Sequence, residues 1–127
     1  MKIFGIGTDI VDVSRIKKSL KNKILIKRLF NVKEISNCKI KKNSANCFAK
    51  RFAAKEAFSK ALGTGISKGL SFKDIEILNN KRGKPILNVN GKSKKIVKKL
   101  IKKRFKTFVS LSDEKSHAIA SVIISIN

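Results

Sequence analysis

The stretch RFAAKEAFSKALGTGI, residues 51–66, constrains the fold of this chain more than any other segment. At about 100° per residue of helix, large apolar side chains gather on one broad face and alanines cover most of the other. A surface helix keeps its charges opposite its apolar stripe, but here Lys55 projects through the large apolar face and Glu56 lies beside Phe52. The stretch therefore predicts a long central helix that ends at Gly63. Its two faces are Phe48, Phe52, Phe58 and Leu62 on one side, and Ala49, Ala53, Ala57 and Ala61 on the other.

Glu56 and Lys60 stand one helical turn apart within this helix. In that order such a pair stabilises a helix by only about 0.2–0.5 kcal/mol. On spacing alone, a solvated surface pair is the favoured interpretation. A function for Glu56 needs support from other parts of the chain.

The overall composition indicates one folded domain, residues 1–127, rather than a disordered chain. The sequence has 127 residues, 42% of them hydrophobic, which suits a single core. The longest apolar runs fall far short of the ~18 residues that span a bilayer. Met1 and Lys2 lead directly into a strand-like segment without a signal region, so we expect a cytoplasmic protein with no membrane partner.

The formal net charge of +23 is the strongest compositional signal. It suggests a polyanionic partner such as nucleic acid, a membrane surface or an acidic protein. All eight aromatic residues are Phe, mostly at core-like helix positions, and no basic segment carries interleaved aromatics for base stacking. Charge alone is therefore weak support for a nucleic-acid-binding protein.

The two cysteines, Cys38 and Cys47, form no CxxC motif and have no histidines at zinc spacing. In a chain expected to be cytoplasmic, this pattern favours reduced structural thiols over a disulfide or a metal site.

Residues 3–11 alternate as a β-strand. Gly5, Gly7 and Asp9 share one face, and the glycines leave room beside Asp9 for a ligand or for another chain packed closely. Asp12 is expected to cap a following helix. On pattern alone, Asp9 is better read as a solvent-facing strand residue.

The rest of the chain mixes strand and helix patterns without a repeat or a linker. Residues 72–78 alternate as a strand, a turn follows, and residues 86–89 continue as its partner. Hairpins in place of regular βαβ units indicate an α+β fold of antiparallel hairpins with the long central helix. The other predicted elements are a helix within 24–36, a polar stretch at 39–46, a helix at 93–104 and a hairpin of 105–112 with 117–126.

The loop of Gly63, Thr64 and Gly65 has two interpretations. It ends the helix with a glycine cap, and its backbone amides are also candidates to donate hydrogen bonds to phosphate oxygens. Short glycine loops are common and this one is not a Walker A sequence, so the motif is weak by itself.

Four segments in this order resemble the holo-acyl-carrier-protein synthase family, the small bacterial 4′-phosphopantetheinyl transferases. They are GIGTDIVDVSRI at 5–16, RFAAKEAFSKALGTGI at 51–66, FKDIEI with GKP at 72–85, and VSLSDEKSHAIASVII at 109–124. The resemblance implies the 4′-phosphopantetheinyl transferase fold. It also implies transfer of the phosphopantetheine arm of coenzyme A to a serine of acyl carrier protein, releasing adenosine 3′,5′-bisphosphate, in fatty acid biosynthesis.

The same resemblance implies a magnesium-dependent enzyme in which Asp9 and Glu56 bind the ion. Mg²⁺ prefers oxygen ligands and is often held by two carboxylates plus phosphates and waters. Lys60 would then reach a phosphate oxygen and stabilise charge on the leaving group. The group that deprotonates the incoming serine stays unassigned, with a water held near Glu56 as a hypothesis.

Further roles follow from the family motifs. Asp113 stands where some relatives have His, so the adenine contacts are not implied, and His117 is interpreted as a packing residue. The family commonly forms trimers with active sites between protomers. The implied coenzyme A-binding residues are Arg51, Lys60, Gly63, Thr64, Gly65, Lys84, Pro85 and Asp113, and the implied carrier-binding residues are Arg15, Lys18 and Lys21.

Two alternatives remain beside the transferase. A small basic nucleic-acid-binding protein, such as a ribosome-associated one, accounts for the charge but leaves Asp9 and Glu56 unexplained. A degenerate relative that only binds the carrier is the other, and intact Asp9, Glu56 and Lys60 argue against it. We expect acyl carrier protein and coenzyme A as partners, and no nucleic acid.

Overall fold

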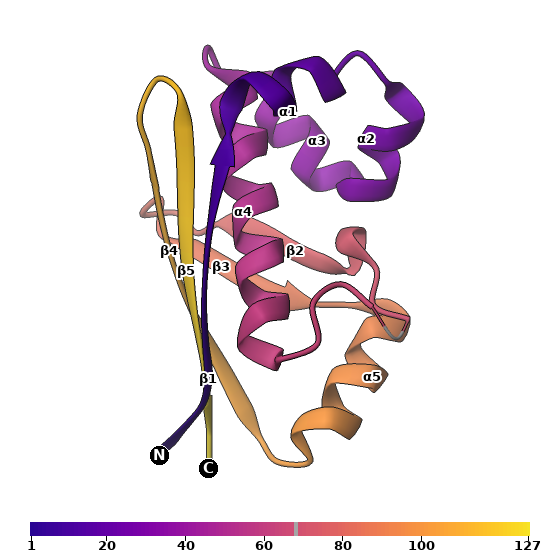
Figure 1. Cartoon of the computed structure of the whole chain (residues 1–127), viewed down its shortest axis with the longest axis vertical. Coiled ribbons are helices and arrows are strands. Elements are labelled where there is room, and N and C mark those ends of the chain that lie inside the picture. The colour runs from indigo at the N-terminus through magenta and orange to yellow at the C-terminus, as the bar shows by residue number, and fades with distance from the viewer. Residues whose placement is uncertain (68) are drawn as a thin grey trace.

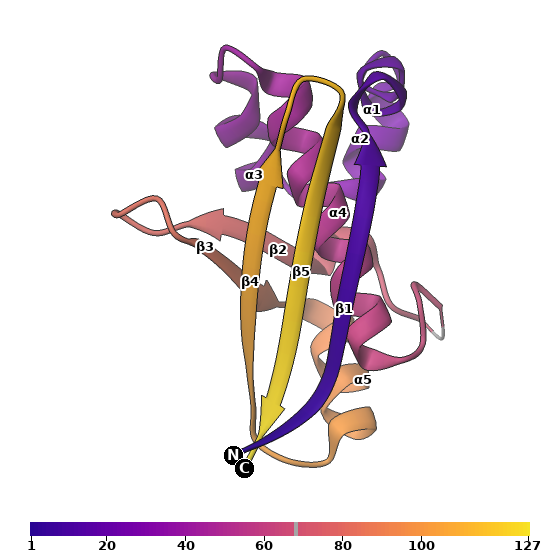
Figure 2. The ribbon, with the colours of Figure 1, turned by 60° about the vertical axis from the view of Figure 1, so that its left-hand side comes forward.

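A three-stranded antiparallel sheet in the order β1-β5-β4 forms one layer of the molecule. The strands are β1 (Lys2–Asp12), β4 (Phe105–Asp113) and β5 (His117–Ile126). The long helix α4 (Ser44–Leu62) lies along this sheet (Figures 1 and 2). The computed structural model describes residues 1–67 and 69–127, and it confirms the predicted first strand, last hairpin and α+β class.

The alanine face of α4 packs on the sheet at very short range. Ala53 and Ala57 have no exposed surface, and Gly5 and Gly7 of β1 face this helix. A Cβ atom on Gly7 would overlap the carbonyl oxygen of Ala57, and one on Gly5 would overlap that of Ala61. The room beside these glycines is thus filled by α4 of the same chain, and the prediction of space there for a ligand or another chain is wrong.

Three short helices cover the amino-terminal half of α4 (Figure 1). They are α1 (Val13–Ser19), α2 (Lys23–Leu29) and α3 (Val32–Lys39). Asp12 caps α1 as expected, since its side chain accepts a hydrogen bond from the Ser14 amide. The single helix predicted within 24–36 is wrong, because Asn31 and Glu34 form a capping box that begins a new helix.

Cys38 and Cys47 form a disulfide, with 5.5 Å between their Cα atoms. The prediction of reduced thiols is therefore wrong. Cys38 lies in the last turn of α3 and Cys47 in the first turn of α4, and the reversal of the chain between these helices brings the two side chains together. Sequence spacing carries no information on that reversal.

The second sheet is a hairpin of β2 (Ile75–Asn79) and β3 (Pro85–Val89), followed by α5 (Gly91–Ile101). The predicted hairpin is confirmed, but residues Phe72–Asp74 form a 3₁₀ turn instead of the start of the strand. Helix α5 ends before the predicted boundary because Lys102 adopts a left-handed conformation, with φ of 61°. None of the helices in the described residues combines the length and the apolar character that a membrane-spanning segment needs.

Lys55, the charge within the large apolar face of α4, is fully buried in an ion pair. Its Nζ donates to Glu34 Oε1 at 2.7 Å and to the Phe72 carbonyl oxygen at 2.8 Å. The Phe30 ring lies 5.1 Å from the same nitrogen. The other Glu34 oxygen accepts from the Ile77 amide, so this pair ties α3, α4 and β2 together.

Candidate active site

Asp9 near the end of β1 and Glu56 on α4 line one cleft of roughly 430 Å³. The structure thus places the two acids in one cleft, and their role as metal ligands stays a prediction. The walls of this cleft include Arg15 of α1 and the apolar side chains Leu25, Leu29, Phe52 and Phe72. An apolar wall lowers the local dielectric constant, so the two acids interact more strongly with any charged group bound between them.

Lys60 binds Asp9 and not Glu56. Its Nζ donates to Asp9 Oδ1 at 2.9 Å and to the Thr8 carbonyl oxygen at 3.0 Å. The surface pair that spacing suggested between Glu56 and Lys60 is therefore not formed. Within the described part of the chain, Glu56 has no cationic partner within the 4.0 Å of an ion pair.

The pKa of Glu56 is raised, first by burial and then by the negative charge of Asp9, with Lys60 opposing the shift. Two carboxylates that destabilise one another are relieved when a cation binds between them. Oxygen donors of this kind suit Mg²⁺, which keeps waters and substrate phosphates as its other ligands. The residues present fit that ion, although no cluster of three or more candidate ligands occurs among the described residues.

A second, basic pocket of about 730 Å³ lies beside the amino-terminal half of α4. Arg51 and Asp113 line it, as the resemblance implied for coenzyme A contacts. Sequence reasoning missed most of its other polar residues. The polar stretch 39–46 was interpreted only as a connection, and no local pattern brings Lys50 or residues 79–81 to the same place. Those residues are Lys41, Lys42, Asn43, Asn46, Lys50, Asn79, Asn80 and Lys81.

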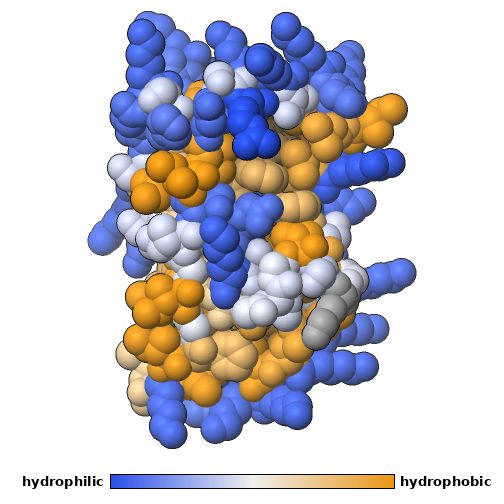
Figure 3. All heavy atoms as spheres, in the orientation of Figure 1, coloured by the Kyte–Doolittle hydropathy of each residue, from blue (hydrophilic) through white to orange (hydrophobic). Residues whose placement is uncertain are grey.

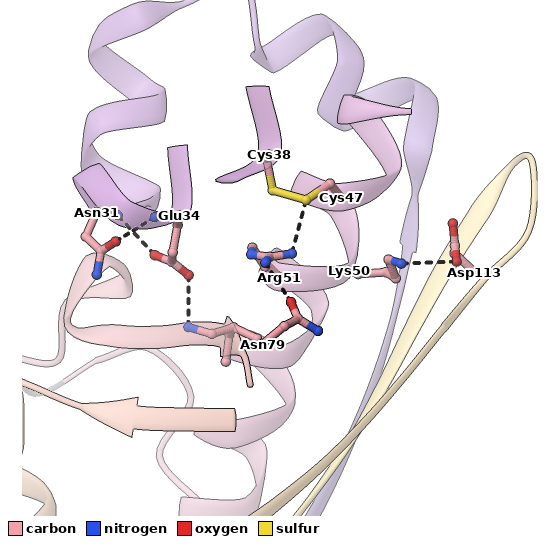
Figure 4. The surroundings of a disulfide bond; sticks show 9 residues. Asn31, Glu34, Cys38, Cys47, Lys50, Arg51, Asn79 and Asp113 are labelled. Carbon is pink, nitrogen blue, oxygen red and sulfur yellow. Dashed lines mark hydrogen bonds and ion pairs between the residues drawn. A yellow bond between two sulfur atoms is a disulfide. The ribbon is translucent and has the colours of Figure 1, made fainter. Parts of the chain in front are cut away.

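Arg51 is only 4% exposed and has incomplete hydrogen bonding. One terminal nitrogen donates to Cys47 Sγ at 3.1 Å and the other to Asn79 Oδ1 at 2.9 Å (Figure 4). Nε is buried without a partner among the described residues, and none of their carboxylates forms an ion pair with Arg51. Burial lowers the pKa of Arg51, so a bound anion would compensate its charge.

Asp113 at the end of β4 is held by two side chains of α4. Asn46 Nδ2 donates to one carboxylate oxygen at 2.8 Å, and Lys50 Nζ lies 3.4 Å from the other (Figure 4). The carboxylate is thus partly neutralised within the basic pocket. His117, predicted to pack, is instead exposed and contacts Ser116 and Glu114.

The loop after α4 does not offer its amides to a ligand. Gly63 donates to the Lys60 carbonyl, while Thr64 and Gly65 both donate to that of Ser59. Gly63 has φ of 85°, which identifies the left-handed helix cap. The suggestion that these amides receive phosphate oxygens is not supported by this geometry.

The remaining predicted residues are accessible. Lys84 is exposed in the β2–β3 turn and Pro85 begins β3, while the adjacent Gly83 reaches the basic pocket. Lys18 and Lys21 are exposed around the end of α1.

The acid cleft and the basic pocket lie on different sides of α4. Arg51 and Glu56 are five positions apart in the sequence, which corresponds to about 140° around the helix axis. Lys60 lies about 13 Å along that axis from Arg51, at a rise of 1.5 Å per residue. One chain therefore does not bring all the predicted site residues together.

Comparison with known proteins assigns the chain to a family. Residues 5–122 match the family model described as the 4′-phosphopantetheinyl transferase superfamily. The chain belongs to that superfamily, and the resemblance seen in its motifs is confirmed.

The similar proteins carry one particular name within this class. A holo-[acyl-carrier-protein] synthase of Pelagibacter ubique is 54% identical over 98% of each chain. One from Clostridium botulinum is 46% identical, again over 98% of each. A solved Bacillus anthracis synthase, in complex with CoA (3′,5′-ADP), superposes with a TM-score of 0.82 at 37% identity over 100% of both chains. The Neisseria meningitidis enzyme gives 0.84 at 35% identity, over 97% of this chain and 98% of that one.

Proposed function

We propose that this protein is a holo-acyl-carrier-protein synthase. It transfers 4′-phosphopantetheine from coenzyme A to a serine hydroxyl of apo acyl carrier protein and releases adenosine 3′,5′-bisphosphate, in fatty acid biosynthesis. The convergence of Asp9 and Glu56 in one cleft carries this proposal, supported by 54% identity to a synthase along nearly the whole chain. Residues 1–127 then form a single transferase domain.

Asp9 and Glu56 are the proposed magnesium ligands, one from β1 and one from α4. When bound, the ion neutralises phosphate charge and orients the pyrophosphate for attack. Lys60, which already lies 2.9 Å from Asp9 Oδ1, is exposed enough to turn to a phosphate oxygen and stabilise negative charge on the leaving group. The apolar side chains of the cleft exclude water from the reacting atoms.

The basic pocket is the proposed site for the nucleotide end of coenzyme A. Among the described residues, Arg51 Nε is buried without a hydrogen-bond partner, and a phosphate oxygen would satisfy it. Lys41, Lys42 and Lys81 add positive charge around it. We retain Gly63, Thr64, Gly65, Lys84 and Pro85 as proposed coenzyme A contacts through atoms other than the amides used at the helix end.

A complete site then requires two copies of the chain. The sheet face that points away from α4 exposes large apolar side chains: Ile6 is 61% exposed, Ile10 64% and Phe108 47%. In Figure 3 apolar side chains reach the surface along the left-hand side, where the sheet lies. We propose a homotrimer through this face, in which the acid cleft of one protomer adjoins the basic pocket of its neighbour.

The carrier protein is proposed to dock on α1. Arg15 lines the acid cleft, and Lys18 and Lys21 continue the exposed positive charge beside it. An acidic carrier would be steered to this end of the molecule and would present its serine to the cleft.

The test is the intact mass of apo acyl carrier protein after incubation with the protein, coenzyme A and Mg²⁺. We expect the mass gain of one phosphopantetheine arm, lost in EDTA and with Glu56→Gln, and retained with Glu114→Gln, an exposed acid in the β4–β5 turn. Transfer that persists both in EDTA and with Glu56→Gln would show that neither the metal nor Glu56 is required. No transfer with several carriers, together with tight and salt-sensitive RNA binding, would favour the nucleic-acid alternative.

A further inference from the structure

We propose that Cys38 and Cys47 are a redox couple that controls the basic pocket: the disulfide holds the pocket ready for coenzyme A, and reduction weakens its binding. This inference rests on the proposed function, since coenzyme A is taken as the ligand of that pocket. It adds to that function a thiol–disulfide regulation of the same site.

The disulfide closes the segment that forms one wall of the pocket. Cys38 and Cys47 lie 9 positions apart in the sequence. Between them Lys41, Lys42 and Asn46 line the pocket. With both ends of the segment joined, these side chains sample fewer arrangements, so less conformational entropy is lost when a ligand orders them.

The disulfide also touches the buried cation of the pocket. Arg51 donates to Cys47 Sγ at 3.1 Å (Figure 4). In the disulfide that sulfur is uncharged, and the charge of Arg51 remains available to a phosphate. After reduction, the guanidinium favours a thiolate on Cys47, and the resulting ion pair competes with the ligand. The loss of loop ordering and the new ion pair thus both weaken coenzyme A binding in the reduced protein.

The two sulfurs differ in their access to solvent, although both residues are buried: Cys47 is only 7% exposed. Cys47 lines the pocket, whereas Cys38 has no exposed surface. A small disulfide of the glutathione class would therefore meet Cys47 first. The Cys47 thiolate attacks it to form a mixed disulfide and release one thiol; the Cys38 sulfur, losing its proton, then displaces the second thiol. Two protein thiols are oxidised and one small disulfide is reduced to two thiols.

The experiment uses the full chain, whose only thiols are these two cysteines. The protein is equilibrated with reduced and oxidised glutathione in varied ratio, free thiols are trapped by alkylation, and intact mass gives the oxidised fraction. The affinity for acetyl-coenzyme A, whose blocked thiol cannot exchange with the disulfide, is then measured by calorimetry on the fully oxidised and fully reduced protein. We expect both thiols to disappear together and the Kd to be about 3- to 10-fold higher in the reduced state. Cys38→Ser/Cys47→Ser should bind with one Kd under both conditions.

The outcomes separate this inference from the proposed function. Equal Kd values for the two redox states, or thiols that never pair, would overturn the inference while coenzyme A binding and transfer stand. Absence of coenzyme A binding in both states would instead reject the proposed function, and the regulation with it. The comparison of the two wild-type states remains decisive even if the double variant does not fold.

Discussion

Glu56 lies half-buried on α4, and both burial and the charge of Asp9 raise its pKa. A folded-state pKa above the unfolded value means that the ionised carboxylate destabilises the folded protein. That destabilisation is fully present at pH values above the raised pKa and is relieved as the pH falls toward the ordinary value of 4.5. The proposed metal would relieve it at neutral pH by the same electrostatic reasoning.

We therefore expect Glu56→Gln to raise the melting temperature by about 1–3 °C at neutral pH while abolishing transfer. Calorimetry over a pH series should show this gain shrinking as the pH falls. Millimolar Mg²⁺ should raise the melting temperature of the wild type but not of the variant. A variant that is less stable than the wild type at neutral pH would contradict the assigned repulsion.

Lys55 and Glu34 form a buried pair in which neither side chain is exposed. Removing one partner leaves an uncompensated charge, so Lys55→Met should lower the free energy of unfolding by about 3–5 kcal/mol. The double variant Glu34→Gln/Lys55→Met should recover much of this loss. Urea unfolding of the wild type, the two single variants Lys55→Met and Glu34→Gln, and the double variant gives the coupling energy. The exposed Lys95→Met is the control. Additive losses would show that the pair is not coupled.

At the scale of elements, the contact of β1 with α4 positions the acid cleft, since each element contributes one carboxylate. Gly7 makes this contact possible because its missing side chain admits the Ala57 carbonyl. Gly7→Ala must push the strand and the helix apart.

We expect Gly7→Ala to lower stability by about 1–3 kcal/mol and to reduce transfer as well, because Asp9 moves with the strand. Gly83→Ala is the control: its φ of 84° is unfavourable for alanine, but no atom lies near its missing Cβ. Its effect on the free energy of unfolding should stay near the roughly 1 kcal/mol cost of a left-handed backbone for alanine. Turnover is compared only for Gly7→Ala, because Gly83 reaches the basic pocket. Equal losses for the two variants would argue against the close-contact explanation.

At the scale of the whole molecule, the proposed trimer divides each active site between two protomers. Glu56→Gln removes the acid half and Arg51→Met the basic half, so each variant alone should be inactive. In trimers assembled from equal amounts of both, about a quarter of the sites receive two intact halves.

Co-expression with two different tags and purification on both isolates these mixed trimers. Every mixed trimer has one intact site of three, so transfer at about a third of the wild-type rate would support sites between protomers. A mixture as inactive as its parents would place the whole site within one chain. Phe108→Glu, on the uncovered sheet face, should shift the mass measured by light scattering to that of a monomer.

The positive charge is also a property of the whole molecule. Charges exposed on α1 are screened by salt far more than the buried Arg51. Raising the salt concentration should therefore weaken carrier binding by more than coenzyme A binding, as measured by calorimetry with each partner. Equal salt sensitivity would contradict docking by complementary charge.

The sequence by itself determined the α+β class, the long central helix, both hairpins and the family. These features depend on local periodicity, caps and motifs, which neighbouring residues encode. It also predicted Asp9 and Glu56 as candidate metal ligands, but only through the resemblance, because a lone acid on a strand or helix is more often solvated.

The tertiary structure alone decided which side chains meet across distant segments. The pairing of Lys60 with Asp9, the burial of Lys55 against Glu34 and the disulfide of Cys38 with Cys47 all depend on how elements reverse and pack. The basic pocket likewise collects residues from α3, α4 and the β2–β3 turn. No local pattern encodes such contacts, since their energy comes from groups that are far apart in the chain and become neighbours only after folding.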